Sequence, residues 1–485
     1  MSTLTATSIV DSVPTDLLIA GRWVPTDTRI AVDNPATGEV IAHVADATAA
    51  HGASALHAAH TAAAEWSATD PRYRSDILRR AFELVQARSE ELALLITTEM
   101  GKPLAEARGE VTYAAEFLRW FSEEAVRIAG RYSQAPLGGT RLITIKQPVG
   151  PVLAITPWNF PLAMGTRKVG PALAAGCTVI IKPSEFTPLT TLEFGRILLE
   201  AGVPDGVVNI ITTSDAPGVC TPLIADERLR KITFTGSTPV GRKLIEQSAH
   251  NVQRVSMELG GNAPFIVCDD ADLDRAVDGA MLAKMRNNGE ACTAANRFIV
   301  HRSVAEQFTA RLSERMCALV VGNGVDAATQ LGPLINENAV TKVRELVDDA
   351  VARGARAIAP DTAPREIGYF HPPTVLTDVP PSARIMSEEV FGPVAPVTTF
   401  DTDDEALRLA NATEYGLVGY VFTENISRAV RLAEGLQTGM VGLNQGVVSN
   451  PAAPFGGVKA SGTGREGGTE GIEEYLETKY VGLAL

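Results

Sequence analysis

Cys292 is the residue of this sequence whose type and position best suit nucleophilic chemistry. It lies in the small polar segment 287–297, after a predicted helix over 273–286 and before a predicted strand over 298–301. A thiol at a tight helix-to-strand connection can be held partly exposed, with backbone amides directed at it, as a reactive cysteine requires. Cysteine is also among the most buried residue types, so a core thiol is the competing interpretation. The choice between them depends on the residues that accompany Cys292.

Glu258 is a candidate general base. It follows a predicted strand and lies between apolar neighbours and the pair Gly260-Gly261. A charge in such surroundings is unfavourable unless it is used or paired. Because a partly desolvated carboxylate binds protons more tightly than an exposed one, Glu258 has the properties of a general base.

Asn159 is a candidate donor to a developing oxyanion. It stands at the centre of Pro157-Trp158-Asn159-Phe160-Pro161, where two prolines fix a short turn between a strand and a helix. One side-chain amide held in this way typically accounts for about 10² to 10³ in rate. The alternative is that Asn159 only forms the turn, with Trp158 and Phe160 as ordinary core residues.

The residues between 151 and 259 alternate between short apolar strands and helical stretches. The predicted strands cover 152–155, 178–181, 207–211 and 232–235. This alternation is typical of βαβ units, which build a parallel, doubly wound sheet that binds a nucleotide at its carboxyl edge. The sequence therefore predicts an α/β fold that brings polar residues at strand ends together.

Two segments at strand ends resemble nucleotide-binding loops, although the usual G-x-G-x-x-G fingerprint is absent. Gly236 and Ser237 lead from a strand towards a helix, where unpaired amides and the helix dipole attract phosphate. Lys182, Ser184 and Glu185 follow another strand, and Glu185 would accept hydrogen bonds from ribose hydroxyls and repel a 2′-phosphate. The competing interpretations are helix capping at Ser237 and a surface ion pair between Lys182 and Glu185.

The sequence of the N-terminal third of the chain predicts strands and helices that pack against the rest of the fold. Residues 1–18 have the composition of a loose tail, and strands are expected near 18–24 and 40–44. Apolar positions with helical spacing then run through 47–129. We expect this region to support the fold rather than the chemistry.

Length and composition limit the classes of function. A chain of 485 residues suggests about three domains or subdomains. With 43 basic against 57 acidic residues, the net charge of −14 disfavours nucleic acid or an anionic membrane as the main partner. Five widely spaced cysteines favour a reducing compartment and indicate neither a disulfide framework nor a metal site. Because no targeting peptide and no apolar run of ~20 residues is seen, we expect a cytoplasmic protein.

Seven ordered motifs resemble those of the NAD(P)-dependent aldehyde dehydrogenase superfamily, from about residue 18 to the end of the chain. Any one of them alone would be a weak signal, but their common order makes the resemblance specific. It implies an aldehyde dehydrogenase-like α/β fold with a Rossmann-type cofactor domain, an α/β catalytic domain and a small β oligomerisation extension. The motifs are Pro157 to Pro161, Lys182 to Glu185, Phe234 to Ser237, Glu258 to Asn262, Gly289 to Cys292, Glu388 to Pro393 and Pro454 to Lys459.

The resemblance implies NAD(P)-dependent oxidation of an aldehyde to a carboxylic acid through a cysteine thiohemiacetal and a thioester. Cys292 would attack the aldehyde carbon, and Asn159 with the Cys292 amide would stabilise the oxyanion. Glu258 would then activate water to release the acid. A free thiol with a pKa of about 8.5 is only a few per cent thiolate at neutral pH, so local activation must be supplied.

The resemblance also implies how the cofactor would be held. Glu185 argues for NAD, whereas Lys182 and Ser184 leave NADP open. Lys182 and Glu185 would bind the adenosine ribose and Ser237 the pyrophosphate. The full set of implied cofactor-binding residues is Thr156, Pro157, Trp158, Lys182, Ser184, Glu185, Gly236, Ser237, Glu389 and Phe391, of which the last two would contact the nicotinamide side.

Within the superfamily, the sequence is most similar to succinate-semialdehyde dehydrogenases, notably around Arg167, at Arg286 and in the tail 464–480. The similarity implies that Arg167 and Arg286 hold a distal carboxylate of the substrate, which suits a guanidinium fork, with Ser449 as a further contact. The alternative is that each arginine caps a helix or pairs with a nearby acid. Glutarate semialdehyde, 2-oxoglutarate semialdehyde and an aromatic aldehyde remain open as substrates.

The same resemblance divides the chain into domains. The C-terminal strand-like run and the hairpin around Gly138-Gly139 would need to be covered, because exposed edges aggregate and isolated hairpins are marginally stable. We therefore expect a homodimer or homotetramer. The implied division is a cofactor-binding domain (1–130 and 148–262), a catalytic domain (263–450), an oligomerisation arm (131–147 and 470–485) and a returning linker (451–469).

Two other classes of protein are compatible with this fold. One is a CoA-acylating transferase, in which a thiol cleaves the thioester; Glu258 argues against it because water activation would then be unnecessary. The other is a catalytically idle structural or binding protein. The presence of Cys292, Glu258 and Asn159 together in one chain argues against that class.

Overall fold

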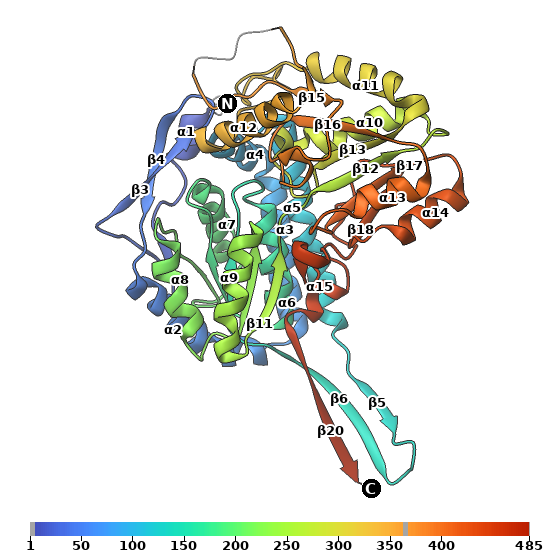
Figure 1. Ribbon diagram of the computed structural model, residues 1–485. Helices are drawn as coiled ribbons and strands as arrows, with labels where there is room; N and C mark the ends of the chain where they lie inside the picture. The colour runs from blue at the N-terminus through green and yellow to red at the C-terminus, as the bar shows by residue number, and fades with distance from the viewer. Residues whose placement is uncertain (1–4, 362–366, 485) are drawn as a thin grey trace.

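The computed structural model describes residues 5–361 and 367–484, and its first large sheet confirms the predicted doubly wound α/β fold (Figure 1). Five parallel strands form its centre, and they are apolar and buried on both faces, as expected for a parallel sheet covered by helices. In sheet order these strands are β11 (Arg254–Glu258), β10 (Lys231–Thr235), β7 (Val152–Ile155), β8 (Val179–Lys182) and β9 (Val208–Ile210).

Antiparallel strands extend this sheet at both edges. Strands β1 (Leu17–Ile19) and β2 (Arg22–Val24) continue it beyond β9, and β19 (Gly462–Thr463) pairs with β11. The chain turns between β1 and β2 at Ala20 and Gly21, which both have positive φ. The segment predicted as a single strand over 18–24 is therefore a tight hairpin.

The order of the parallel strands reverses next to β7, because β8 lies on one side of it and β10 on the other. The loops that leave β7 and β10 consequently diverge at the carboxyl edge of the sheet. Such a topological switch point opens a crevice in which α/β proteins bind ligands. The segments around Asn159 and Ser237 are the first residues of these two loops.

Helices cover both faces of the first sheet. Alternate residues of each strand, such as Val152 and Leu153, belong to separate apolar clusters on the two faces. One face packs on α2 (Ala49–Ala68), α8 (Ala216–Ala225) and α9 (Thr238–Ser248). The other packs on α6 (Ala163–Ala175) and α7 (Pro188–Glu200), which α3 (Pro71–Ala87), α4 (Ser89–Met100) and α5 (Leu104–Glu124) cover in turn.

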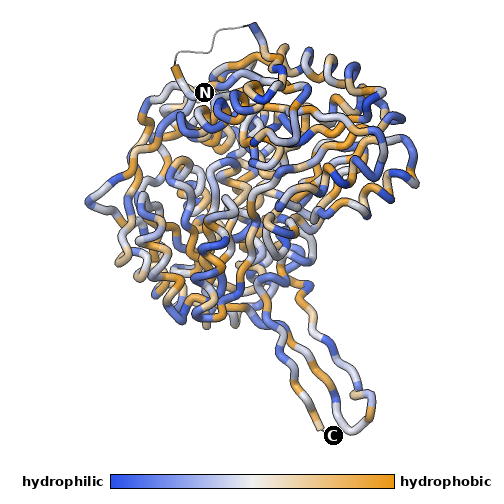
Figure 2. The backbone as a smooth tube through the Cα atoms, in the orientation of Figure 1, coloured by the Kyte–Doolittle hydropathy of each residue, from blue (hydrophilic) through white to orange (hydrophobic). Residues whose placement is uncertain are grey.

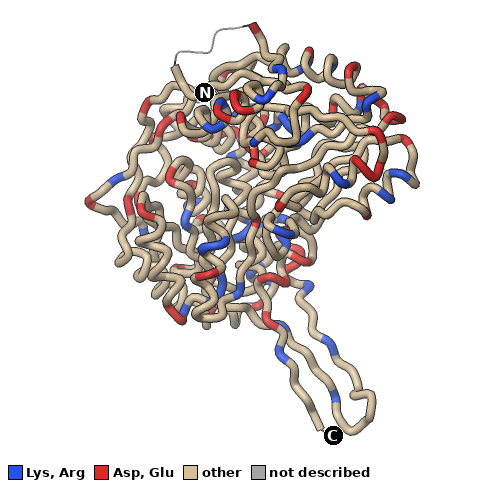
Figure 3. The backbone as a smooth tube through the Cα atoms, in the orientation of Figure 1, with Lys and Arg blue, Asp and Glu red and all other residues tan. Residues whose placement is uncertain are grey.

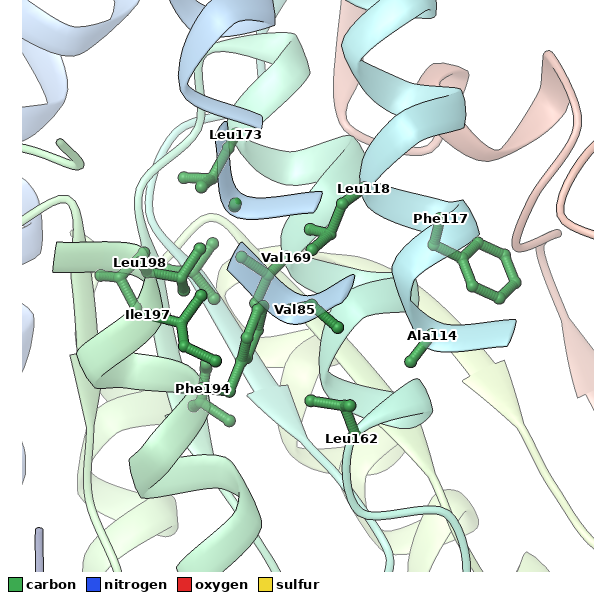
Figure 4. Packing of buried hydrophobic residues seen from close by; sticks show 14 of the residues in the cluster. Val85, Ala114, Phe117, Leu118, Leu162, Val169, Leu173, Phe194, Ile197 and Leu198 are labelled. Atoms are coloured by element: carbon green, nitrogen blue, oxygen red, sulfur yellow. The ribbon is translucent and has the colours of Figure 1, made fainter. Parts of the chain in front are cut away.

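The core around α5, α6 and α7 is built from interlocking aliphatic and aromatic side chains (Figure 4). Phe117 and Leu118 of α5 and Val169 and Leu173 of α6 belong to this cluster, and all four are fully buried. Burial of each large side chain stabilises the fold by about 1.5–3 kcal/mol. This packing fixes α5 and α6 relative to each other, and both helices carry residues of the site described below.

The second large sheet follows the first in the sequence and is also mostly parallel. Its strands, in sheet order, are β14 (Arg356–Ile358), β15 (Thr374–Thr377), β16 (Val394–Phe400), β13 (Ala295–His301), β12 (Ala263–Val267), β17 (Val418–Phe422) and β18 (Met440–Leu443). Its helices are α10 (Leu273–Met285), α11 (Arg302–Cys317), α12 (Glu337–Ala352), α13 (Asp403–Asn411) and α14 (Ile426–Gly435).

The two sheets meet end to end. Only residues 259–262 connect the carboxyl end of β11 to the amino end of β12, and β13 begins three residues after Cys292. Glu258 at the end of one sheet and Cys292 at the start of the other are therefore brought to the same boundary.

A three-stranded antiparallel sheet projects from the body of the molecule (Figure 1). It consists of β5 (Arg131–Gln134), β6 (Thr140–Pro148) and β20 (Leu476–Ala484), in the order β20-β6-β5. Gly138 and Gly139 have φ of 78° and 75° and turn the chain between β5 and β6, as the sequence predicts. Leu485, the last residue of the predicted terminal strand, lies outside the described residues. Figure 2 shows apolar stretches along this arm, and Tyr480 and Leu483 of β20 are exposed.

The predicted loose tail is wrong for its described part. Thr5 caps the short helix α1 (Ala6–Val10), and Ile9, Val10 and Val13 are buried in the main core. A helix of five residues is too short to show a clear periodicity in the sequence, and it is stable only through tertiary packing. Residues 1–4 lie outside the described part of the chain.

Two small elements complete the fold. Strands β3 (Arg29–Asn34) and β4 (Glu39–Ala45) form a separate ribbon, and α15 (Glu470–Glu473) precedes the arm. The proposed linker 451–469 contributes β19 to the first sheet, and the division into domains remains our interpretation.

Basic and acidic residues are interspersed along most of the chain (Figure 3). In residues 5–361 and 367–484, no helix combines the length and the hydropathy needed to traverse a lipid bilayer.

Candidate active site

A cavity of about 230 Å³ opens where the two sheets meet. Its walls come from the loops after β7 and β10, from the end of β11 and from the segment before β13. It contains all six residues that the sequence predicts for catalysis and substrate binding: Asn159, Arg167, Glu258, Arg286, Cys292 and Ser449. Six of the predicted cofactor-binding residues also line it: Pro157, Trp158, Gly236, Ser237, Glu389 and Phe391.

The loop that carries Cys292 is held by residues in left-handed conformations. Asn287 and Asn288 have φ of 58° and 59°, and asparagine tolerates this region better than most residues. Gly289 follows with φ of 76°, and a Cβ at this position would lie 2.4 Å from the carbonyl oxygen of Gly392. Cys292 itself is half-buried and lines the cavity, so it is not the core thiol of the competing interpretation.

Gly261 permits the close approach of the Cys292 loop to the 259–262 connection. A Cβ at Gly261 would lie 2.5 Å from the carbonyl oxygen of Cys292, which leaves no room for any larger residue. The 259–262 connection and the loop that carries Cys292 therefore pack directly against each other.

Burial raises the pKa of the Cys292 thiol to about 12, although the positive charge of Arg167 opposes this rise. The carboxyl groups of Glu258 and Glu389 add to it. The thiol is consequently neutral near pH 7 in the absence of ligands. A nucleophilic role therefore requires a base that takes the proton.

The side chain of Asn159 is held in place by one hydrogen bond and keeps a second amide proton for a ligand. Its Nδ2 donates to the carbonyl oxygen of Glu290 (2.9 Å), which is two residues before Cys292. Asn287 Nδ2 donates both to that oxygen (2.9 Å) and to the Asn159 carbonyl oxygen (3.0 Å). Because an amide nitrogen carries two protons, one proton of Asn159 remains for a ligand in the cavity.

Lys102 and Glu110 hold the turn that carries Asn159, and sequence reasoning missed both. Lys102 is fully buried, pairs with Glu110 (Nζ to Oε2, 2.5 Å) and donates to the Asn159 carbonyl oxygen (2.7 Å). The other oxygen of Glu110 accepts from the backbone amides of Leu162 (2.9 Å) and Ala163 (3.2 Å). The pair therefore grips the turn on both sides of Pro161. A lysine and a glutamate eight residues apart in a helical region gave no sequence signal for this contact.

Glu258 is the last residue of β11, and both its carboxylate oxygens are buried without a hydrogen-bond partner among the described residues. Burial and the negative charge of Glu466 raise the pKa of this carboxyl well above its ordinary value. Arg167 and Lys168 partly oppose the rise. When ionised, Glu258 is accordingly a stronger base than an exposed glutamate.

Arg167 lines the cavity but already has a carboxylate partner. It pairs with Glu466 (Nη2 to Oε2, 2.6 Å), and its guanidinium lies 4.1 Å from the ring centre of Phe455. Lys168 pairs with the other oxygen of Glu466 (2.5 Å). Burial alone would lower the pKa of Arg167, but the charge of Glu466 raises it above its usual value. Glu466 lies in the tail motif and was not identified from the sequence.

Arg286 has no ion pair within the described residues. Its guanidinium lies over the ring of Phe160 (5.5 Å) and 3.5 Å from the Thr293 hydroxyl. Ser449 lines the same cavity from the segment after β18. Of the two arginines, Arg286 is the one whose charge is free for a ligand.

The turn after β10 has the features of an anion site. Ser237 is the N-cap of α9, and its side chain makes no capping hydrogen bond, so its exposed hydroxyl and the first amides of the helix are available. Gly236 donates from its amide to the Glu258 carbonyl oxygen (3.0 Å). The helix begins at Thr238, and Pro239 is favourable in its first turn.

The remaining predicted cofactor residues are Thr156, Lys182, Ser184 and Glu185, and they lie outside the cavity lining. Thr156 directly follows β7, and the other three lie at the end of the neighbouring strand β8. Lys182 ends β8, and its ammonium lies 3.4 Å from Glu185 Oε2. Ser184 contacts the same carboxylate oxygen (3.5 Å). The amide of Thr156 donates to the Lys182 carbonyl oxygen (3.1 Å), which places these residues beside the loop after β7.

Glu389 and Phe391 form another part of the cavity wall. Glu389 accepts from the Gly261 amide (3.0 Å), and burial raises the pKa of its carboxyl to about 7. Phe391 packs edge-to-face on Trp158, with ring centres 5.5 Å apart. The wall is thus apolar around one buried carboxyl group.

Comparisons with known proteins point to one family. The model of the aldehyde dehydrogenase family matches residues 23–481. The chain is 57% identical to a succinate-semialdehyde dehydrogenase of Paenarthrobacter nicotinovorans over 92% of this chain and 99% of that protein. It is 47% identical to the succinate-semialdehyde dehydrogenase [NADP(+)] of Escherichia coli, over 96% and 97% of the two chains. A crystal structure of succinate-semialdehyde dehydrogenase from Burkholderia pseudomallei superposes with a TM-score of 0.97 at 46% identity and covers 100% of both chains.

Proposed function

The chain belongs to the aldehyde dehydrogenase family, and from that premise we propose that it oxidises succinate semialdehyde to succinate, with NAD or NADP as the electron acceptor. The observation that carries the proposal is the meeting of Cys292, Asn159 and Glu258 in one cavity beside the unpaired Arg286. A thiol, an amide donor, a buried base and a free cation are the groups that this reaction needs.

The first step is attack of the Cys292 sulfur on the aldehyde carbon. Because the neutral thiol is favoured in this cavity, its proton must leave, and the basic carboxylate of Glu258 is the acceptor that lines the same cavity. A carbon–sulfur bond forms, and the carbonyl electrons move to the oxygen. The free amide proton of Asn159 and the Cys292 amide would donate to that oxygen.

A bound NAD or NADP would supply the hydride acceptor, and the carbon that Cys292 holds would become a thioester when it loses the hydride. The residues present fit such a cofactor, because the unused hydroxyl of Ser237 at the start of α9 suits a pyrophosphate. Lys182 and Glu185, at the next strand end, would hold the adenosine ribose. Glu389 and Phe391 would hold the nicotinamide side.

Hydrolysis of the thioester completes the reaction. Glu258 would take a proton from water, the water oxygen would attack the thioester carbon, and the Cys292 sulfur would leave as a thiolate. Since neither oxygen of Glu258 has a hydrogen-bond partner in the part of the chain that the structure describes, both are available to a water molecule. A transferase that uses CoA would have no need for this base.

The proposed substrate carries a distal carboxylate, and Arg286 and Ser449 would bind it. Arg286 has no protein carboxylate partner in the described part of the chain, and its stacking on Phe160 limits the positions of its guanidinium. Arg167 is paired with Glu466. We therefore propose that its charge acts mainly by opposing the rise in the pKa values of Cys292 and Glu258. Glutarate semialdehyde is the second candidate substrate, because a longer chain could reach the same guanidinium.

The test is a panel of aldehydes with and without a terminal carboxylate, with both cofactors and without CoA. We expect stoichiometric reduced cofactor and a clear preference for succinate semialdehyde. Arg286→Ala should lower kcat/KM for the charged aldehydes far more than for butanal, whereas Arg79→Ala, at an exposed ion pair outside the cavity, should change neither. Equal losses for charged and uncharged aldehydes would contradict the carboxylate assignment.

We further propose that the arm, β5, β6 and β20, joins two copies of the chain. Its outer strands have free edges within the described residues, and Tyr132, Tyr480 and Leu483 expose apolar surface. Such edges are stable in solution when they are covered. Sedimentation at micromolar concentration should show a dimer or a tetramer, and deletion of residues 476–485 should reduce it to smaller species. A monomeric wild type would contradict this proposal.

A further inference from the structure

We propose that Tyr113 is a specificity-determining residue whose hydroxyl donates a hydrogen bond to the distal carboxylate of the substrate, beside Arg286 and Ser449. This inference rests on the proposed function and adds an uncharged hydrogen-bond donor to the proposed carboxylate site. Tyr113 lies in the helical region whose periodicity predicts only packing, and no motif of the sequence points to it.

Tyr113 is placed at the cavity by helix α5. It lines the cavity, and its ring packs edge-to-face on Phe117, four residues further along the same helix (4.9 Å between ring centres). Glu110, three residues earlier on the same helical face, holds the turn that carries Asn159. One face of α5 therefore positions both the turn of the oxyanion donor and the phenol.

The hydroxyl of Tyr113 has no satisfactory protein partner. Its oxygen is buried, and no hydrogen bond of acceptable geometry joins it to the described residues. The Ser449 hydroxyl is nevertheless close enough to lower the pKa of the phenol slightly, which places the two side chains together. A buried donor without a partner is unfavourable, so the site is complete only when a ligand or a water molecule accepts from it.

The electrostatics of the site select the class of ligand. The positive charges of Arg167 and Arg286 both act on Tyr113. Burial nevertheless raises the pKa of the phenol, so it stays protonated at neutral pH and can donate. Arg167 is already paired, whereas Arg286 is not. A phenol proton, a serine hydroxyl and an unpaired guanidinium together suit a group that only accepts and carries negative charge, namely a carboxylate.

The test compares Tyr113→Phe with wild type on succinate semialdehyde and on butanal, which has the same chain length without the charge. Loss of one hydrogen bond to a charged group should lower the ratio of the two kcat/KM values by about tenfold or more. Tyr73→Phe, at an exposed position on α3 outside this cavity, is the matched control and should leave the ratio unchanged. An unchanged ratio in Tyr113→Phe would overturn the inference and assign the hydroxyl to a bound water.

A binding measurement without turnover provides the second readout. Succinate should protect Cys292 from iodoacetamide in the wild type, and Tyr113→Phe should require about tenfold more succinate for the same protection. Equal protection in both proteins would contradict a contact to the carboxylate. Failure of this inference can be distinguished from failure of the proposed function. A wild type with no preference for succinate semialdehyde over butanal would contradict both. If the wild type shows that preference and Tyr113→Phe retains it unchanged, only the proposed role of Tyr113 is contradicted.

Discussion

The ammonium of buried Lys102 donates a hydrogen bond of 2.7 Å to the backbone carbonyl oxygen of Asn159, 57 residues further along the chain. Asn159 is thereby held from its main chain by Lys102 and from its side chain by the Glu290 carbonyl. The position of the proposed oxyanion donor thus depends on a buried ion pair that never touches the substrate.

We expect Lys102→Met to destabilise the protein by about 3–5 kcal/mol, because it leaves Glu110 buried without a counter-charge. The double variant Lys102→Met with Glu110→Gln should recover much of this stability, since the glutamine oxygen still accepts from the amides of Leu162 and Ala163. Chemical denaturation measures both. In the double variant kcat should fall while KM changes little. A double variant with normal kcat would contradict the positioning role of Lys102.

Asn159→Ala should lower kcat by about 10² to 10³, which is the usual loss for one oxyanion donor. The rate at which iodoacetamide alkylates Cys292 should change little, because that reaction develops no oxyanion. Steady-state kinetics and alkylation rates measured on the same preparation separate the two effects. If alkylation falls in parallel with kcat, Asn159 acts on the thiol and our assignment is wrong.

Alkylation of Cys292 in the ligand-free protein should accelerate steadily as pH rises from 6 to 10. Burial raises the pKa of this thiol to about 12, so the thiolate fraction grows through the whole interval. The midpoint should lie well above the value of about 8.5 for a free cysteine. A plateau reached below pH 8 would show that the free protein already activates its thiol.

Glu258→Gln should stabilise the protein, and increasingly so as pH rises. The folded state raises the pKa of Glu258, so the wild type loses stability between the unfolded value of about 4.3 and the raised folded value. Glutamine does not titrate, and the difference in Tm between variant and wild type should therefore grow from pH 5 upwards. Glu83→Gln, at an exposed ion pair, is the control. A difference that shrinks with pH would contradict the raised pKa.

The parts of the site that the sequence predicts lie at the ends of strands. Asn159, Ser237 and Glu258 follow or end three neighbouring parallel strands, so the sheet topology alone brings them together. Cys292 joins them because the short 259–262 connection places the second sheet end to end with the first. These relations follow from apolar alternation and from motif order, which are both visible in the sequence.

The parts that the sequence does not predict are contacts between helices and distant loops. Glu466 pairs with Lys168 across 298 positions and also with Arg167, and the second contact is the pairing with an acid that the sequence leaves open as the alternative to a substrate contact. Tyr113 and Lys102 belong to a helical region that is largely apolar, and only packing decides which of its side chains face the cavity. Helix α1 was missed for a related reason, since its stability comes from burial of Ile9 and Val10.

The proposed mechanism requires that Cys292 forms a covalent thioester with the substrate and that Glu258 activates the water molecule that hydrolyses it. The most direct test is rapid acid quenching of Glu258→Gln with succinate semialdehyde and NAD or NADP at about pH 9, where hydroxide can take the thiol proton in place of Glu258, followed by peptide mass analysis. We expect one equivalent of reduced cofactor per active site in a burst and a succinyl group on the peptide that contains Cys292. Cys292→Ala should give neither. A burst without an adduct, or an adduct on another residue, would contradict the account.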